Sequence, residues 1–236
     1  MTFLLALTAC VLTVDTVDKT IEADGPLTGA DLHVSSGTVT VDGDAEATGA
    51  IAEMSARFSG SEPSLSHDVD ADGVFSVESI CQPELAICEI TADVTLPEAI
   101  SLKVLVDSGD LDVRAMTGAL DLETGSGDVD LDTPLGDTLL ATGSGNITVK
   151  RATAATLEAS TGSGEITVGF TVAPTKVKIG TGSGDVELSV PAGSYALSTD
   201  VGSGEVHVDD GIVIDASSPN VLDLSTGSGD IRVQAE

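Results

Sequence analysis

Aromatic residues are nearly absent from this chain of 236 residues, which has no tryptophan, one tyrosine and four phenylalanines. Apolar residues still make up 41% of the sequence, which is enough to bury a core and excludes a disordered protein. That core must be built from Val, Ile, Leu and Ala. Such side chains favour thin packed layers over a thick globular centre.

Basic residues are also scarce, since nine Lys and Arg stand against 39 Asp and Glu, a formal net charge of -30. A field of this sign repels nucleic acid and anionic lipid head groups, so we expect no nucleic-acid partner. The acidity indicates a solvated, soluble surface, and cation binding is the alternative.

Long hydrophobic runs are missing, and the longest, residues 3–9, is too short to span a bilayer. It is typical of the end of a signal peptide, and the Leu-Thr-Ala-Cys stretch that ends at Cys10 resembles a bacterial lipobox. We therefore expect a signal remnant over 1–10, lipidation of Cys10, and a tether with a lead-in strand over 11–24. Because a basic leader is lacking, the natural start would lie upstream or the chain would be trimmed. A buried strand with an incidental cysteine is the alternative.

Cysteine is rare, with three residues in the chain. If Cys10 is acylated, Cys81 and Cys88 remain as a pair whose six intervening residues can close a small disulfide loop. A disulfide needs an oxidising compartment, so we expect an extracytoplasmic protein, anchored to the membrane through Cys10 or secreted.

What the sequence has in abundance is a repeated motif, Thr-Gly-Ser-Gly followed by an acidic residue and alternating apolar positions. The second glycine of each unit recurs at spacings of 18, 18, 19, 20, 20 and 25 residues. We name these residues the marker glycines: Gly109, Gly127, Gly145, Gly164, Gly184, Gly204 and Gly229. A half-buried strand is predicted on each side of the motif. Glycine suits the corner between them because it adopts positive φ and leaves room for a stacked neighbour.

Two folds fit two short strands per repeat: a solenoid, in which equivalent strands stack in parallel, and an antiparallel meander. We favour an all-β, right-handed parallel β-solenoid with about 18–20 residues per coil, because identical residues recur at identical depth. Residues 101–236 would form its regular coils.

Residues 25–100 show the same pattern in diluted form and are expected to form the N-terminal coils and a cap, so that 25–236 is one continuous domain. Within them, 45–73 is irregular; an outer β-hairpin is favoured over a helical turn. The segment 73–99 indicates strand, disulfide loop and strand. At the other end, 209–220 is expected to be a surface loop, and the chain ends in an open coil.

The repeated Ser-Gly-Asp-Val units behind the segment ADVTLPEAISLKVLVDSGDLDV resemble the bacterial "putative adhesin" domain family, whose function is unknown and which occurs in exported and envelope proteins. The resemblance covers about residues 25–236. It implies the repeat architecture and supplies no catalytic residue.

No sequence signature of an enzyme is present: the chain lacks a nucleophile elbow, a P-loop, a zinc-protease helix motif and a dinucleotide fingerprint. A carboxylate pair acting on a glycan is the weakest hypothesis, because such enzymes bind sugars on aromatic platforms. We therefore expect no enzyme.

The residue after each marker glycine is acidic in all units but one, where it is Asn146, so these side chains would form a row about 5 Å apart in a solenoid. Calcium would relieve their repulsion. We favour a solvated acidic edge without cofactor, and keep as calcium candidates Asp110, Asp128, Glu165, Asp185, Glu205 and Asp230.

The expected function is a structural or binding module of the bacterial envelope, monomeric, with a protein or glycan partner at the cell surface and membrane contact only through the lipid. Binding would use one mildly basic patch on the side of the solenoid, formed by Thr148, Lys150, Arg151, Thr167, Lys176 and Lys178. The alternatives are a sensing domain that binds a protein through an open coil at 226–236, and a cation-loaded row of acids.

Overall fold

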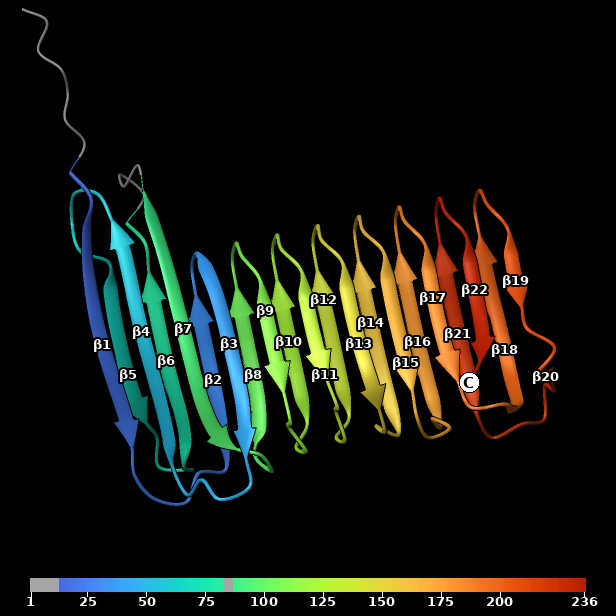
Figure 1. Ribbon diagram of the computed structural model, residues 1–236, viewed down its shortest axis with the longest axis horizontal. Coiled ribbons are helices and arrows are strands. Elements are labelled where there is room, and N and C mark those ends of the chain that lie inside the picture. The colour runs from blue at the N-terminus through green and yellow to red at the C-terminus, as the bar shows by residue number, and fades with distance from the viewer. Residues whose placement is uncertain (1–12, 83–86) are drawn as a thin grey trace, which may run out of the picture.

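The computed structural model describes residues 13–82 and 87–236, and all regular elements in this part of the chain are β-strands. The strands form two long sheets that enclose one core, and the chain passes between the sheets in successive coils (Figure 1). The described residues include no helix of the length and apolarity needed to cross a membrane.

Each sheet has 11 strands. In spatial order, sheet A consists of β1 (Asp15–Ala23), β4 (Ala50–Phe58), β7 (Cys88–Pro97), β3 (Gly37–Asp44), β9 (Leu111–Arg114), β11 (Val129–Asp132), β13 (Ile147–Ala152), β15 (Ile166–Phe170), β17 (Val186–Val190), β22 (Ile231–Ala235) and β19 (Val206–Val208). Sheet B consists of β5 (Ser64–Val69), β6 (Val74–Ile80), β2 (Gly29–Val34), β8 (Ser101–Val106), β10 (Leu120–Thr124), β12 (Thr138–Thr142), β14 (Thr156–Thr161), β16 (Lys176–Thr181), β21 (Val221–Thr226), β18 (Gly193–Val201) and β20 (Ile212–Ile214).

Equivalent strands of successive repeats pair in parallel and in register. In sheet A, Val129 lies between Leu111 and Ile147, which occupy the same position of the adjacent coils. The solenoid prediction is confirmed, and the meander is wrong. Its right-handed winding stays a prediction. Antiparallel pairing occurs at the N-terminal end, where it joins β1 to β4, β4 to β7 and β5 to β6.

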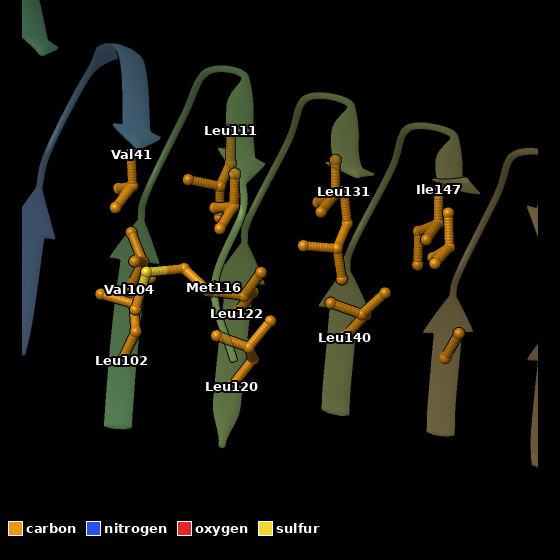
Figure 2. Close-up of a cluster of buried hydrophobic side chains, with 14 of the residues drawn as sticks. Val41, Leu102, Val104, Leu111, Met116, Leu120, Leu122, Leu131, Leu140 and Ile147 are labelled. Carbon is orange, nitrogen blue, oxygen red and sulfur yellow. The ribbon is translucent and has the colours of Figure 1, made fainter. Parts of the chain in front are cut away.

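The core consists of aliphatic ladders that run along the solenoid (Figure 2). Leu122 of sheet B and Leu131 of sheet A are at most 1% exposed, and Met116 adds a buried side chain from the corner after β9. Because the coils are thin, branched aliphatic side chains from the two sheets fill the interior. This accounts for the scarcity of aromatic residues.

The coils do not follow one another in chain order at either end. At the N-terminal end, the β2/β3 coil lies between the β6/β7 coil and the β8/β9 coil. At the C-terminal end, the β21/β22 coil is inserted between β16/β17 and β18/β19 (Figure 1). The prediction of an open coil at 226–236 is therefore wrong: these residues lie inside the row, and the outermost coil is the one that contains β18 and β19.

The structure also differs from two predictions about local segments. Residues 52–58 form part of β4 and have no helical turn, and β4 and β5 belong to different sheets, so they do not pair as the expected outer hairpin. The segment 209–220 contains the short strand β20 in place of a plain surface loop.

The disulfide prediction is confirmed. β6 and β7 flank the bridge between Cys81 and Cys88, whose Cα atoms are 5.9 Å apart. Cys10, with the rest of 1–12, lies outside the described residues.

Candidate functional site

The threonine of the repeated motif is buried and bonds the coils to each other. The Thr124 hydroxyl donates to the carbonyl oxygen of Gly109 in the neighbouring coil, at 2.8 Å. The same bond recurs at 2.9–3.0 Å for Thr142, Thr161, Thr181 and Thr226. The motif's hydroxyl is thus used inside the structure and is not available to a ligand.

Both glycines of the motif are required by stacking. Every marker glycine has positive φ, for example +148° at Gly145. A Cβ added there would overlap the carbonyl oxygen of Gly127, and one on the first glycine, Gly143, would overlap that of Gly125. A larger residue would force the corner away from its neighbour.

The acidic row also bonds coil to coil. The Asp110 side chain accepts the backbone N–H of Asp128 at 2.9 Å, and Asp128 accepts that of Asn146 at 2.7 Å. Asn146, Asp185 and Asp230 do the same for the next coil. Short side chains reach this N–H, which explains why Asp and Asn prevail.

Of the two glutamates in the row, Glu205 belongs to the outermost coil, where no further coil has to be bonded. Among residues 13–82 and 87–236, no three His, Cys, Asp or Glu side chains converge in a group suited to a metal ion. The row is an inter-coil hydrogen-bond ladder at the solenoid edge.

The basic patch predicted on one side is wrong, because its members lie on two opposite sheets. Thr148, Lys150 and Thr167 lie on β13 and β15 of sheet A, whereas Lys176 and Lys178 lie on β16 of sheet B. A period of about twenty residues places neighbouring strands of one repeat in different sheets.

Most of these cations are also neutralised locally. The Lys150 Nζ lies 3.7 Å from a carboxylate oxygen of Asp130, and Arg151 pairs with Asp132 at 2.5 Å. The Lys178 ammonium donates to Glu158 at 2.5 Å, and this bond raises the pKa of Lys178.

An open groove of about 400 Å³ lies on sheet B beside Lys176. It contains Leu139, which is 43% exposed, together with Asp137, Thr156 and Glu158. The mixture of charges gives this groove no preference for one sign of ligand.

The strongest departure from the regular pattern is the outermost coil at the C-terminal end, which we call the open end: β18, β19 and β20. Its inward residues Leu197, Val201 and Val208 are only partly buried, and Val206 is 44% exposed. The corresponding Leu222 of the adjacent coil is fully buried. Apolar side chains therefore reach solvent here because no further coil covers them.

The sequence prediction placed the open coil at 226–236 instead of at β18–β20, although a signal for the correct coil existed. The position of the motif threonine is Val201 in this coil and Val34 and Val106 in the coils next to the N-terminal cap. The threonine is present in the coils between Val106 and Val201 and absent from these outer ones, although the β6/β7 coil has the hydroxyl of Ser79 at this position. Val201 therefore distinguishes its coil from the adjacent β21/β22 coil, which has Thr226 at this position.

The fold and these corners define a repeat protein of the two-sheet, mostly parallel β-solenoid class. The family model described as "Toastrack DUF4097" matches residues 98–234, and the chain belongs to this family. The family resemblance noted in the sequence is thereby confirmed.

Solved structures are similar in fold. One described as a "putative adhesin" from Bacteroides fragilis has a TM-score of 0.50 and 15% identity, covering 94% of this chain and 97% of that one. Another "putative adhesin", from Parabacteroides distasonis, has a TM-score of 0.48, 12% identity and coverage of 92% and 97%. A "putative lipid binding protein" from the same species has a TM-score of 0.39, 12% identity and coverage of 93% and 96%. A search of curated proteins returned no match.

Proposed function

We propose that this chain is a non-enzymatic module of the bacterial cell envelope that binds a protein or glycan outside the cytoplasm. One observation carries the proposal: the threonine hydroxyls and most corner Asp and Asn side chains of the repeated motif are used in coil-to-coil bonds, whereas uncovered apolar side chains gather at the open end. The disulfide and the adhesin names of structures with this fold are consistent with an extracytoplasmic binding role.

A binding experiment with the full chain tests the role. Fluorescently labelled protein is incubated with the envelope fraction of the producing bacterium and with an array of cell-surface glycans. Saturable binding that unlabelled protein displaces is expected. If neither binds and the protein instead releases products from the glycans, the non-enzymatic role is wrong.

Membrane anchoring is a separate part of the proposal. The motif that ends at Cys10 would carry a lipid, which would hold the solenoid at a membrane. Metabolic labelling with an alkyne fatty acid should mark the wild-type chain and leave Cys10→Ser unlabelled. Equal labelling of both would contradict the anchor and leave the binding role untouched.

A further inference from the structure

The outermost long strand of sheet B, β18, has a neighbour along only part of its outer edge. β18 pairs with β21 from Ala196 to Val201, and on its other side β20 pairs with residues 193–195. Beyond Ile214 the chain leaves the row at Asp215, so no described strand lies beside the outer edge of residues 196–201.

The free edge presents backbone groups in strand geometry. The Ala196 N–H donates to Asn220 O at 2.8 Å and the Gly202 N–H to Thr226 O at 3.0 Å, so alternate residues face β21. The N–H and C=O groups of the residues between them, Leu197, Thr199 and Val201, consequently face away from the sheet. An extended peptide can bond to such an edge by strand addition.

The inward side chains of the open end suit an apolar partner. Leu197, Val201 and Val206 are uncharged and partly or largely uncovered. β20 lies beside β18 at the end of sheet B (Figure 1), and the exposed fractions of its residues Val213 and Ile214 are 58% and 60%.

The opposite end differs in the features that prevent strand addition. Lys19 on the edge strand β1 lies opposite the buried Met54 and therefore points inward, where its Nζ donates to Leu65 O at 3.1 Å. On β5, His67 lies opposite buried Val77. Inward charged or polar residues are a known protection of sheet edges. The open end has no inward charged residue; its inward polar residue is the uncharged Thr199, opposite the buried Leu224.

The acidic residues at the open end favour a basic partner. No Lys or Arg occurs between Lys178 and Arg232, whereas Asp200, Glu205 and Asp209 surround the open end. A second copy of this chain would bring the same acids to the interface. A strand with Lys or Arg at its outward positions would instead place cations beside Asp200.

We propose that the edge of residues 196–201 binds an extended segment of a partner protein in which apolar residues alternate with Lys or Arg. The apolar side chains continue the core ladder, and the cations lie on the outer face near Asp200. This inference rests on the proposed binding function and assigns its surface.

The probe is the synthetic peptide Lys-Val-Lys-Val-Lys-Val-Lys, and its binding to the full chain is measured by fluorescence anisotropy at low and high salt. We expect saturable binding that weakens with salt. Backbone N-methylation along one edge of the peptide, and replacement of its lysines by glutamates, should each weaken binding by about tenfold or more. Equal affinity of the N-methylated peptide would overturn strand addition.

Thr199→Lys copies the inward charge of Lys19 at an exposed position and should abolish peptide binding without affecting folding. Thr16→Lys, an identical change on the exposed edge strand at the other end, is the matched control and should retain the affinity. Equal loss in both variants would reduce the effect to net charge and contradict the proposal.

Sedimentation of the same samples identifies a second copy as the occupant. A dimer that Thr199→Lys dissociates, with no peptide binding by the wild type, would overturn the choice of a cationic partner. If Thr199→Lys still binds the envelope fraction like the wild type, the binding function stands and this surface is wrong.

Discussion

The two ends of the solenoid differ in how their sheets end. Each has one coil inserted out of chain order, so that β2/β3 and β21/β22 are both flanked by coils on two sides. The N-terminal end then reverses strand direction through β1, β4 and β5, whereas the C-terminal end stays parallel to its last coil.

The difference shows that parallel stacking does not terminate itself. Each coil offers its neighbour the same hydrogen-bonding edge and the same apolar ladder, so another coil always fits. At the N-terminal end, antiparallel strands and the inward Lys19 interrupt that pattern. At the open end, the parallel pattern continues to the outermost coil, whose edge remains available for binding.

The largest expected difference concerns the marker glycines. Gly145→Ala places a Cβ on the carbonyl oxygen of Gly127. The corner cannot move away from this contact because another coil packs on its other side. The variant should therefore lower the free energy of unfolding by more than about 3 kcal/mol. Gly204→Ala meets Gly229 in the same way, but the outermost coil is free to move outward. We expect about half the loss or less for it in guanidinium unfolding followed by circular dichroism.

Both glycine variants have φ near +145°, so conformational strain is matched between them. Equal destabilisation would mean that the open end is held as rigidly as the middle, and the contrast between the ends would fail. If Gly145→Ala does not fold, its far-ultraviolet spectrum replaces the unfolding curve as the readout.

Truncation of a core leucine should also destabilise the protein more inside the row of coils than at the open end. Leu222 and Leu197 pair in register, and the first is fully buried while the second is partly exposed. Leu222→Ala should cost about 2–5 kcal/mol because it leaves a cavity, and Leu197→Ala about 1 kcal/mol or less. Urea unfolding of the two single variants measures the difference. A larger loss for Leu197→Ala would show that a further layer covers the end.

The repeat allowed the fold to be predicted because period-two strands with glycine corners at about twenty residues stack in only a few ways. Chain order at the ends could not be predicted in this way, since every coil offers nearly the same edge to its neighbours. The information lies in one departure, Val201 in place of the motif threonine. Glu205 carries none, because Glu165 of an interior coil is also a glutamate. The candidate site was missed because it consists of uncovered backbone and core residues, which have no motif.

The threonine hydroxyls that bond adjacent coils allow a further test of whether the threonine-to-valine difference matters at the open end. Thr181→Val removes the hydroxyl that bonds to Gly164 O inside the solenoid and should cost about 1 kcal/mol. Val201→Thr adds the hydroxyl to the outermost coil, beside Gly229, and should stabilise by at most about 0.5 kcal/mol because the site is partly hydrated. Thermal unfolding of the two variants gives the signs. A stabilising Thr181→Val would contradict the bonding role of the ladder.

The smallest effect concerns the turn that returns the chain from β20 to β21 at the open end. The Ser217 hydroxyl and backbone N–H both donate to Asp215 Oδ1, at 2.7 and 2.9 Å, and hold the pKa of this carboxyl below its usual value. A group whose pKa is depressed in the folded state stabilises it above the unfolded pKa, and this contribution is lost as the pH falls through the folded value. The turn should therefore loosen only in acid, below about pH 4.

Carboxyl titration by nuclear magnetic resonance checks this expectation. Ser217→Ala removes the hydroxyl and should move the midpoint of Asp215 upward, whereas Ser218→Ala, whose hydroxyl bonds to Ser194 O instead, is the control in the same turn. The shift should be confined to the open end, because the antiparallel cap has no contact with this turn. An unchanged midpoint in Ser217→Ala would mean that solvent already loosens the turn, and that the open end is less ordered than the rest of the row.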